Sequence, residues 1–242
     1  MKTAILSIDV EQDCPPFLHT MRGVEEGLPK LLRLFREERI AATFFITGQI
    51  AERYPPLVRQ ILEQGHELGC HGHAHRRFDQ MSPKEAKAEL TTAKQILEDF
   101  CCPIVCFRAP NLALPENYLG IIEEQGFSID SSQATYKPPF PKTWSQVGRL
   151  WRIPATATSS IFRLPLAIAW SILSRHEIPV LFVHPWEFID MSKTGVRLDC
   201  RFNTGEKALS LLRNVIRRFR DSGYRFATLE EMGRQINSQL GR

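Results

Sequence analysis

The chain has 242 residues, a length typical of one large domain, and we expect a single domain over residues 1–242. Its formal net charge of +4 is mild, and the one strongly basic stretch, 213–220, places arginines at helical spacing opposite an apolar stripe. This pattern is typical of the solvated face of an amphipathic helix, so we expect no nucleic-acid partner.

Neither a membrane span nor a disulfide framework is indicated. No apolar run approaches the roughly 20 residues that a span needs. The N-terminus leads into the strand-like residues 4–8 without the pattern of a cleaved signal, so we expect a cytoplasmic protein. The six cysteines form no Cys-x-x-Cys pair, which argues against a thiolate zinc site, and we expect most to be buried thiols: Cys14, Cys70, Cys101, Cys102, Cys106 and Cys200.

Strand-like and helix-like segments alternate through the first half of the chain. An apolar strand ends at Asp9, and a loop with two prolines and a glycine follows it. The apolar spacing then predicts a helix over 24–38, a strand over 41–47, a helix over 55–64, a strand over 67–70 and a helix over 83–99. The last of these helices has a clear start, because Ser82 can cap it, Pro83 suits its first position and Glu85 can complete a capping box.

The alternation continues less regularly in the second half. The pattern predicts a strand over 104–107, a helix over 116–125 that Gly126 closes, and a strand over 127–129. The proline-rich stretch 131–165, which includes Pro139 and Pro141, indicates long loops around one strand at 150–153. A strand over 178–183, a helix over 204–221, a strand over 225–227 and a terminal helix from 228 complete the chain.

Seven or eight apolar strands separated mostly by helices predict a parallel sheet covered by helices, and at this length a closed barrel is favoured. Five polar residues lie at the carboxyl ends of different expected strands: Asp9, His71, Arg108, Asp130 and His184. In a barrel those ends converge on one rim, where catalytic residues gather.

The segment 71–75 holds three of the seven histidines of the chain, in the order His-Gly-His-Ala-His. Imidazole and carboxylate groups are the ligands that a zinc-type ion prefers. His71 and His75 share a face if the turn after the strand is helical, and an acidic side chain from elsewhere could complete a three-ligand site with a position open for water. The bland alternative is a solvated turn.

Such a site would give the other rim residues distinct roles. Asp9 can take a proton from the water, Arg108 can orient Asp9, and His184 can protonate a leaving group. This combination indicates an amide or ester hydrolase. Purely structural alternatives are a rim salt bridge for Arg108, a turn cap for Asp130, and a packing role for His184.

Six short segments follow, in order, the five motifs of a known family over residues 5 to about 232. They are Ser-Ile-Asp-Val-Glu at 7–11, Ala-Thr-Phe-Phe at 42–45, the glycine- and histidine-rich segment 65–75, Phe-Arg-Ala-Pro at 107–110, Ile-Asp-Ser-Ser at 129–132 and Leu-Phe-Val-His-Pro-Trp-Glu at 181–187. With these motifs the chain resembles the polysaccharide deacetylases with a NodB homology domain, also called carbohydrate esterase family 4.

The resemblance implies a fold, a reaction and roles for named residues. The fold would be an α/β distorted (β/α)7 TIM-like barrel, and the reaction the metal-dependent removal of N-acyl groups from amino sugars. The metal would be Zn²⁺ first, with Co²⁺, Ni²⁺ or Mn²⁺ as alternatives. By the resemblance Asp9 looks like the base, His71 and His75 like metal ligands, Arg108 like the residue that orients the base, Asp130 like the partner of the acid, and His184 like the acid.

Some positions depart from the family pattern. Val10 follows Asp9 where the family has a second aspartate, so the third ligand would be Glu11 or Asp13. Glu11 is preferred because alternate residues of a strand point to the same side, which places it beside Asp9. Three further substitutions change the substrate surface more than the metal site: Gly72 for Ser or Thr, Asn111 for an aromatic residue, and Ser132 or Gln133 for a second acid.

The motifs indicate the type of reaction more clearly than they indicate the substrate. Asn111 and Trp186 are candidate substrate contacts. The His-Pro-Trp-Glu motif and the segment 22–29 look closer to relatives that act on nucleotide-linked or lipid-linked sugars, including deformylases of lipid-linked aminoarabinose. We therefore expect an N-acylated sugar or glycan as substrate, with an acetyl or formyl group to remove.

Three rival interpretations compete with a carbohydrate deacetylase. A metallo-β-lactamase needs an Asp-His pair where this chain has His75-Arg76, and an amidohydrolase opens with His-x-His at its first strand, where this chain has Asp9. The rival from a different class is a metal-free or inactive deacetylase-like protein that binds an acylated sugar without turning it over. Metal content would distinguish that rival from the enzyme.

Overall fold

The computed structural model describes residues 2–101, 103–138 and 142–239, so Cys102, Pro139 and Pro141 lie outside the described residues. The chain forms two compact units, each assembled from two separate stretches. Unit 1 comprises Met1–Ala42 and Thr156–Ala227, and unit 2 comprises Thr43–Ala155 and Thr228–Arg242. The expectation of one domain stays a prediction.

Unit 1 contains a parallel three-stranded sheet with its longest strand in the middle. β1 (Lys2–Val10) pairs with β8 (Val180–Val183) from Ile5↔Val180 onward, and with β9 (Tyr224–Ala227) from Lys2↔Tyr224 onward. Eight of the nine β1 residues are buried, as in a strand covered on both faces. The apolar run before Asp9 therefore marks a central strand.

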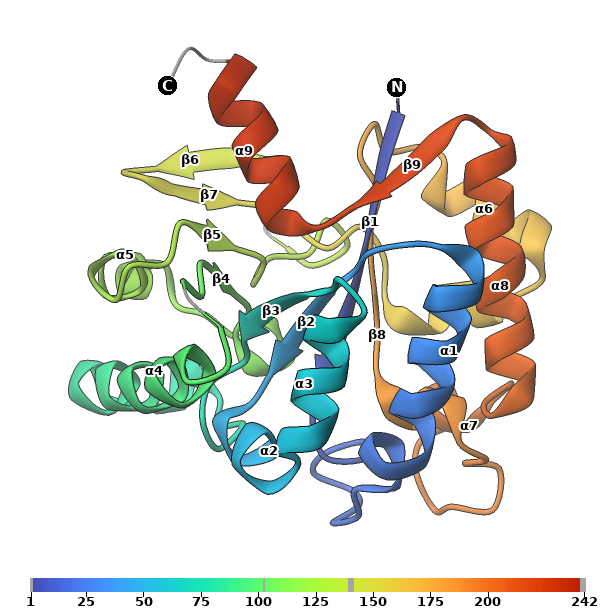
Figure 1. Ribbon diagram of the computed structural model, residues 1–242, viewed down its shortest axis with the longest axis horizontal. Coiled ribbons are helices and arrows are strands. Elements are labelled where there is room, and N and C mark those ends of the chain that lie inside the picture. The colour runs from blue at the N-terminus through green and yellow to red at the C-terminus, as the bar shows by residue number, and fades with distance from the viewer. Residues whose placement is uncertain (1, 102, 139–141, 240–242) are drawn as a thin grey trace. The chain divides into compact units, whose positions relative to one another are not determined.

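The helical segments of unit 1 are η1 (Gly23–Gly27), α1 (Leu28–Glu38), η5 (Ser159–Arg163), α6 (Leu166–Leu173), η6 (Pro185–Phe188), α7 (Leu198–Arg201) and α8 (Glu206–Asp221). α8 packs against α1 and α6 (Figure 1). Its apolar stripe is buried, and Arg217 and Arg220 form ion pairs of 2.8 and 3.1 Å with the buried Glu38 of α1. This confirms the expected amphipathic helix.

Unit 2 contains a six-stranded sheet in the order β6-β7-β5-β4-β3-β2. Its strands are β2 (Thr43–Ile46), β3 (Glu67–Cys70), β4 (Cys106–Phe107), β5 (Ile129–Asp130), β6 (Ser145–Val147) and β7 (Leu150–Arg152). Neighbouring strands are parallel except β6 and β7, which are antiparallel. The expected parallel sheet is confirmed apart from this antiparallel edge, where Gly148, with φ +60°, lies in the turn between β6 and β7.

The helical segments of unit 2 are α2 (Gly48–Arg53), α3 (Pro55–Glu63), η2 (Phe78–Gln80), α4 (Pro83–Glu98), η3 (Pro110–Leu112), η4 (Glu116–Tyr118), α5 (Leu119–Glu124) and α9 (Leu229–Gln239). α4 begins with the expected capping box, in which Ser82 and Glu85 bond each other's backbone N–H. Four α-helices or strands have no counterpart in the sequence prediction: α2, β6, α6 and α7.

The expected rim residues lie at the carboxyl ends of strands in both units. In unit 1, Asp9 is the penultimate residue of β1 and His184 directly follows β8. In unit 2, His71 follows β3, Arg108 follows β4 and Asp130 ends β5. This part of the sequence prediction is confirmed.

Within the described ranges, no helix is long and apolar enough to cross a membrane. Among the described residues, Cys14, Cys70 and Cys106 are buried free thiols, and Cys200 is a half-buried free thiol.

Candidate active site

In unit 1, two carboxylates and an imidazole gather after β1 and β8. Asp9 and Glu11 are 4% and 6% exposed, and the Glu11 Oε1 atom lies 3.6 Å from the His184 Nε2 atom. Burial alone lowers the pKa of the His184 imidazole, but the charges of Glu11, Glu187 and Asp9 outweigh burial and raise it to about 9. These charges favour the protonated imidazole, which is the form that a general acid needs.

The His184 ring is packed between aromatic side chains. It stacks on Trp186 with the ring centroids 4.9 Å apart and an interplanar angle of 19°, and meets the edge of Phe182 at 5.5 Å. Trp186 is 5% exposed and packs in an apolar cluster with Cys14, Ile189, Met191 and Val196. These contacts of Trp186 are with other side chains of the protein. Its predicted role in substrate binding stays a prediction.

Two glycines allow the segment 22–29 to pack closely against the His-Pro-Trp-Glu motif. A Cβ atom at Gly23 would lie 2.5 Å from the Trp186 backbone nitrogen, and one at Gly27 would lie 2.1 Å from the Pro185 carbonyl oxygen. Only glycine permits so close an approach of two backbones. The two motifs that set this chain apart in the sequence are therefore packed on each other.

Asp13 is committed to the loop that follows β1. Its carboxylate is fully buried and accepts hydrogen bonds from the Thr20 hydroxyl at 2.6 Å and from the backbone N–H groups of Arg22 at 2.9 Å and Gly23 at 2.8 Å. Burial raises the pKa of Asp13, and these hydrogen bonds act against that rise. With its oxygens occupied in this way, Asp13 fits a structural role, and Glu11 is the better candidate for the third ligand.

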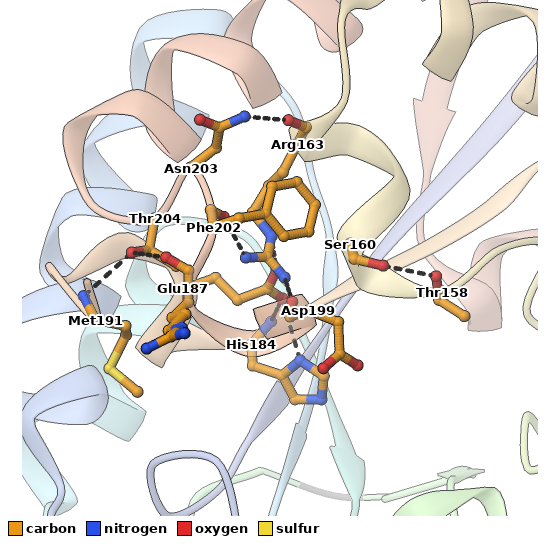
Figure 2. Close-up of polar contacts among 11 residues, drawn as sticks. Thr158, Ser160, Arg163, His184, Glu187, Met191, Asp199, Phe202, Asn203 and Thr204 are labelled. Carbon is orange, nitrogen blue, oxygen red and sulfur yellow. Dashed lines mark hydrogen bonds and ion pairs between the residues drawn. The ribbon is translucent and has the colours of Figure 1, made fainter. Parts of the chain in front are cut away.

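Glu187 is a candidate functional residue that the sequence prediction did not single out. Its Oε1 atom accepts the backbone N–H of His184 at 2.9 Å and lies 3.1 Å from the His184 Nδ1 atom. On its other side, Oε2 lies 2.8 Å from the Nε atom of Arg163. Figure 2 shows His184, Glu187 and Arg163 in contact in this order. Glu187 belongs to a quoted motif, whereas no sequence signal indicates Arg163.

In unit 2, His71 and His75 bring their rings together after β3, with centroids 5.2 Å apart. His71 is 1% exposed, and its Nδ1 atom lies 2.8 Å from the carbonyl oxygen of Arg108. A carbonyl oxygen can only accept a hydrogen bond, so the Nδ1 atom of His71 donates, and Nε2 is the ring nitrogen left to bind a metal. This is the arrangement that metal-binding histidines usually show.

The loop that carries these histidines is not helical. His75 has φ +55° and Gly72 has φ +76°, so the helical turn considered for 71–75 is absent and the rings meet through a tight loop. Glu89 of α4 fixes the loop by accepting the N–H groups of His73 at 2.9 Å and Ala74 at 2.6 Å. The left-handed backbone at position 72 favours the glycine that this chain has there.

Arg108 and Asp130 are both fully buried in unit 2. Arg108 donates to the carbonyl oxygen and the hydroxyl of Ser131 at 3.1 and 2.8 Å, and its guanidinium lies 4.3 Å from the centroid of the Phe45 ring. Asp130 accepts the backbone N–H of Ser132 at 3.0 Å and pairs with Arg152 at 2.9 Å. Burial raises the pKa of Asp130, and Arg152 acts against that rise.

The contacts of Asp130 bear on its expected role as partner of the acid. The carboxylate that the structure places beside the Nδ1 atom of His184 is that of Glu187. Asp130 instead links the ends of β5 and β7 through Arg152. Asn111 is exposed and has φ +58°. Its backbone carbonyl oxygen accepts a hydrogen bond from the Lys137 ammonium at 3.1 Å. Its predicted role in substrate binding stays a prediction.

Comparison with known proteins identifies the family. Residues 11–129 match the polysaccharide deacetylase family model. A peptidoglycan-N-acetylglucosamine deacetylase of Bacillus cereus is 25% identical over 206 residues, which are 84% of this chain and 80% of that protein. A second protein of that name from B. cereus is 30% identical over 105 residues, 43% of this chain, and the aligned part spans only 38% of that relative's length.

Solved structures show the same fold. A Mycobacterium smegmatis protein assigned to the polysaccharide deacetylases aligns with 98% of this chain and 91% of its own, with a TM-score of 0.74 at 21% identity. A family 4 carbohydrate esterase pseudoenzyme from Bacillus anthracis aligns with 96% of this chain and 65% of its own, with a TM-score of 0.66 at 16% identity. The fold is α/β, of the distorted (β/α)7 TIM-like barrel type. The chain belongs to the polysaccharide deacetylases with a NodB homology domain, carbohydrate esterase family 4.

Proposed function

We propose that this protein is a metal-dependent hydrolase that removes an N-acyl group, acetyl or formyl, from an amino sugar within a glycan. The observation that carries the proposal is the paired, oriented imidazoles of unit 2, with the Nδ1 atom of His71 held by a backbone carbonyl. The acidic and protonated groups after β1 and β8 supply the chemistry of amide cleavage.

The donor set fits a zinc-type ion. His71 and His75 would each offer a ring nitrogen, and Glu11 would offer a carboxylate oxygen, which makes three protein ligands of the kind that catalytic zinc sites use. Asp13 is left out because its oxygens already accept three hydrogen bonds. A bound Zn²⁺, Co²⁺, Ni²⁺ or Mn²⁺ ion would polarise the acyl carbonyl and make water a better nucleophile at neutral pH.

Each proton transfer of the reaction would then have its own side chain. Asp9 would take a proton from the attacking water, and Arg108 would orient Asp9. His184 delivers a proton to the departing amine as the C–N bond breaks, which the raised pKa of its imidazole favours. Without that proton the amine would leave as a strongly basic anion.

The relatives point to the class of glycan. Their names describe deacetylation of N-acetylglucosamine in peptidoglycan and of chitooligosaccharides. Both substrates present an N-acetylated amino sugar, so N-acetylated oligosaccharides are the first substrates to test. A lipid-linked or nucleotide-linked amino sugar is the second, because the His-Pro-Trp-Glu motif and the segment 22–29 look closer to relatives that act on such sugars.

The first test is metal content. In wild-type protein, elemental analysis should find about one divalent ion per chain, and His75→Ala should lose most of it together with deacetylase activity, since two remaining ligands hold an ion poorly. His73→Ala is the matched control: His73 is the third histidine of the same loop and lies outside the proposed ligand set. Equal metal in wild type and His75→Ala would refute the site, and wild-type protein with neither metal nor turnover would favour the inactive, sugar-binding alternative.

A second test separates Glu11 from Asp13. Asp13→Asn should lower the free energy of unfolding by about 1–3 kcal/mol, because an amide NH₂ would face a buried N–H donor, and it should keep the metal. Glu11→Gln should show the reverse, with metal lost and stability less affected. Urea unfolding and elemental analysis of both proteins decide the matter. Metal lost from Asp13→Asn but retained by Glu11→Gln would exchange the two assignments.

A further inference from the structure

The Glu187 carboxylate is fully buried and shared between two partners of unit 1 (Figure 2). One oxygen faces both the backbone nitrogen and the ring Nδ1 atom of His184, at 2.9 and 3.1 Å. The other oxygen is 2.8 Å from Arg163. Because no part of Glu187 is exposed, it cannot touch a substrate, and any effect on the reaction must pass through His184.

Arg163 is held too firmly to move away from Glu187. It is 1% exposed and donates to the carbonyl oxygens of Phe202 at 2.7 Å and Asp199 at 2.6 Å. Its guanidinium also lies 4.7 Å from the centroid of the Phe202 ring. A buried guanidinium with its donors committed in this way fixes the position of the carboxylate that neutralises it.

We infer that Glu187, clamped by Arg163, is the positioning residue for the proton donor His184. By accepting the Nδ1–H group, Glu187 sets the ring so that the Nε2–H bond faces the side of Glu11 and is the one available for donation. The inference rests on the proposed function for the role of His184. It gives to Glu187 the place that the family resemblance assigned to Asp130, whose carboxylate is occupied by Ser132 and Arg152.

The first experiment measures turnover by the zinc-loaded full chain on an N-acetylated chitooligosaccharide. Glu187→Gln should lower kcat about ten- to a hundredfold and leave KM within about threefold, because part of the contribution of the proton donor is lost while substrate contacts remain. Glu38→Gln is the matched control, because Glu38 is also a buried acid of unit 1 paired with arginines. It should lose stability and keep kcat. An unchanged kcat in Glu187→Gln would overturn the inference.

A double variant separates positioning from charge neutralisation. Glu187→Gln alone leaves the buried Arg163 charge uncompensated and so also threatens folding. Glu187→Gln/Arg163→Met removes both charges and should recover most of the melting temperature. If Glu187 positions His184, kcat stays low in this double variant. Recovery of kcat together with stability would show that Glu187 only neutralises Arg163, and would overturn the inference.

A spectroscopic readout needs no turnover. The ¹H NMR spectrum of the zinc-loaded protein should contain a far-downfield Nδ1–H resonance that is absent from His184→Ala, which assigns it. In Glu187→Gln and in the double variant, this resonance should shift upfield or vanish, because an amide is a weaker acceptor than a carboxylate. An unchanged resonance would overturn the inference. If wild-type protein shows the resonance but no deacetylation, the proposed function fails while the contact between Glu187 and His184 stands.

Discussion

Replacing Asp9 with asparagine is expected to lower kcat by a factor on the order of a hundred or more while leaving the metal content nearly intact. The change keeps the size and shape of a side chain that is 4% exposed, so packing after β1 should survive. An amide cannot accept a proton from the attacking water, so the loss should fall on kcat and only weakly on KM. Kinetics with a chitooligosaccharide and elemental analysis of the same preparation test both parts.

The outcome for Asp9 also distinguishes a base from a ligand. Glu11→Gln should lose metal and activity together, whereas Asp9→Asn should lose activity alone. If Asp9→Asn loses the metal, Asp9 is a ligand and the base must be sought elsewhere. If its activity stays within a few fold of wild type, water activation does not depend on Asp9.

Much of the fold could be predicted from the sequence, because strong local signals agree with the tertiary structure. The strand at 67–70 has the bounds of β3, and the capping box at Ser82 begins α4. α6 was not predicted because its segment, Leu-Ala-Ile-Ala-Trp-Ser-Ile-Leu, is almost uniformly apolar and shows little helical periodicity. β6 was not predicted because its three residues are polar or exposed and are defined only by pairing with β7.

The candidate site could be predicted where a motif places a reactive side chain directly after a strand, as at His71 and His184. The residues that support the site, such as Asp13 and Arg163, could not be predicted. The role of Asp13 depends on the hydroxyl and N–H donors of a loop seven to ten residues away, which only the folded loop presents. Arg163 lies in a stretch without periodicity, and its pairing with Glu187 joins residues 24 positions apart. Contacts of this kind leave no local pattern in a single sequence.

Replacing His184 with alanine is expected to slow amide substrates by a factor on the order of a hundred to ten thousand, while an activated aryl acetate should slow by less than about tenfold. An amine is a poor leaving group that must be protonated as the C–N bond breaks, and activation of the water does not supply that proton. A phenolate is weakly basic and leaves without such help. The comparison requires the same enzyme preparation, substrates at saturation and equal metal content.

The aryl ester thus serves as an internal control for damage to the site. His184 also stacks on Trp186 and contacts Glu11, so its removal could disturb the apolar cluster or a metal ligand. Such damage would lower turnover of amide and ester alike, because both need the activated water. Equal losses on the two substrates would therefore mean that His184 holds Trp186 and its neighbours in place. A selective loss on the amide, with metal retained, would show that the imidazolium beside Glu187 is the proton donor.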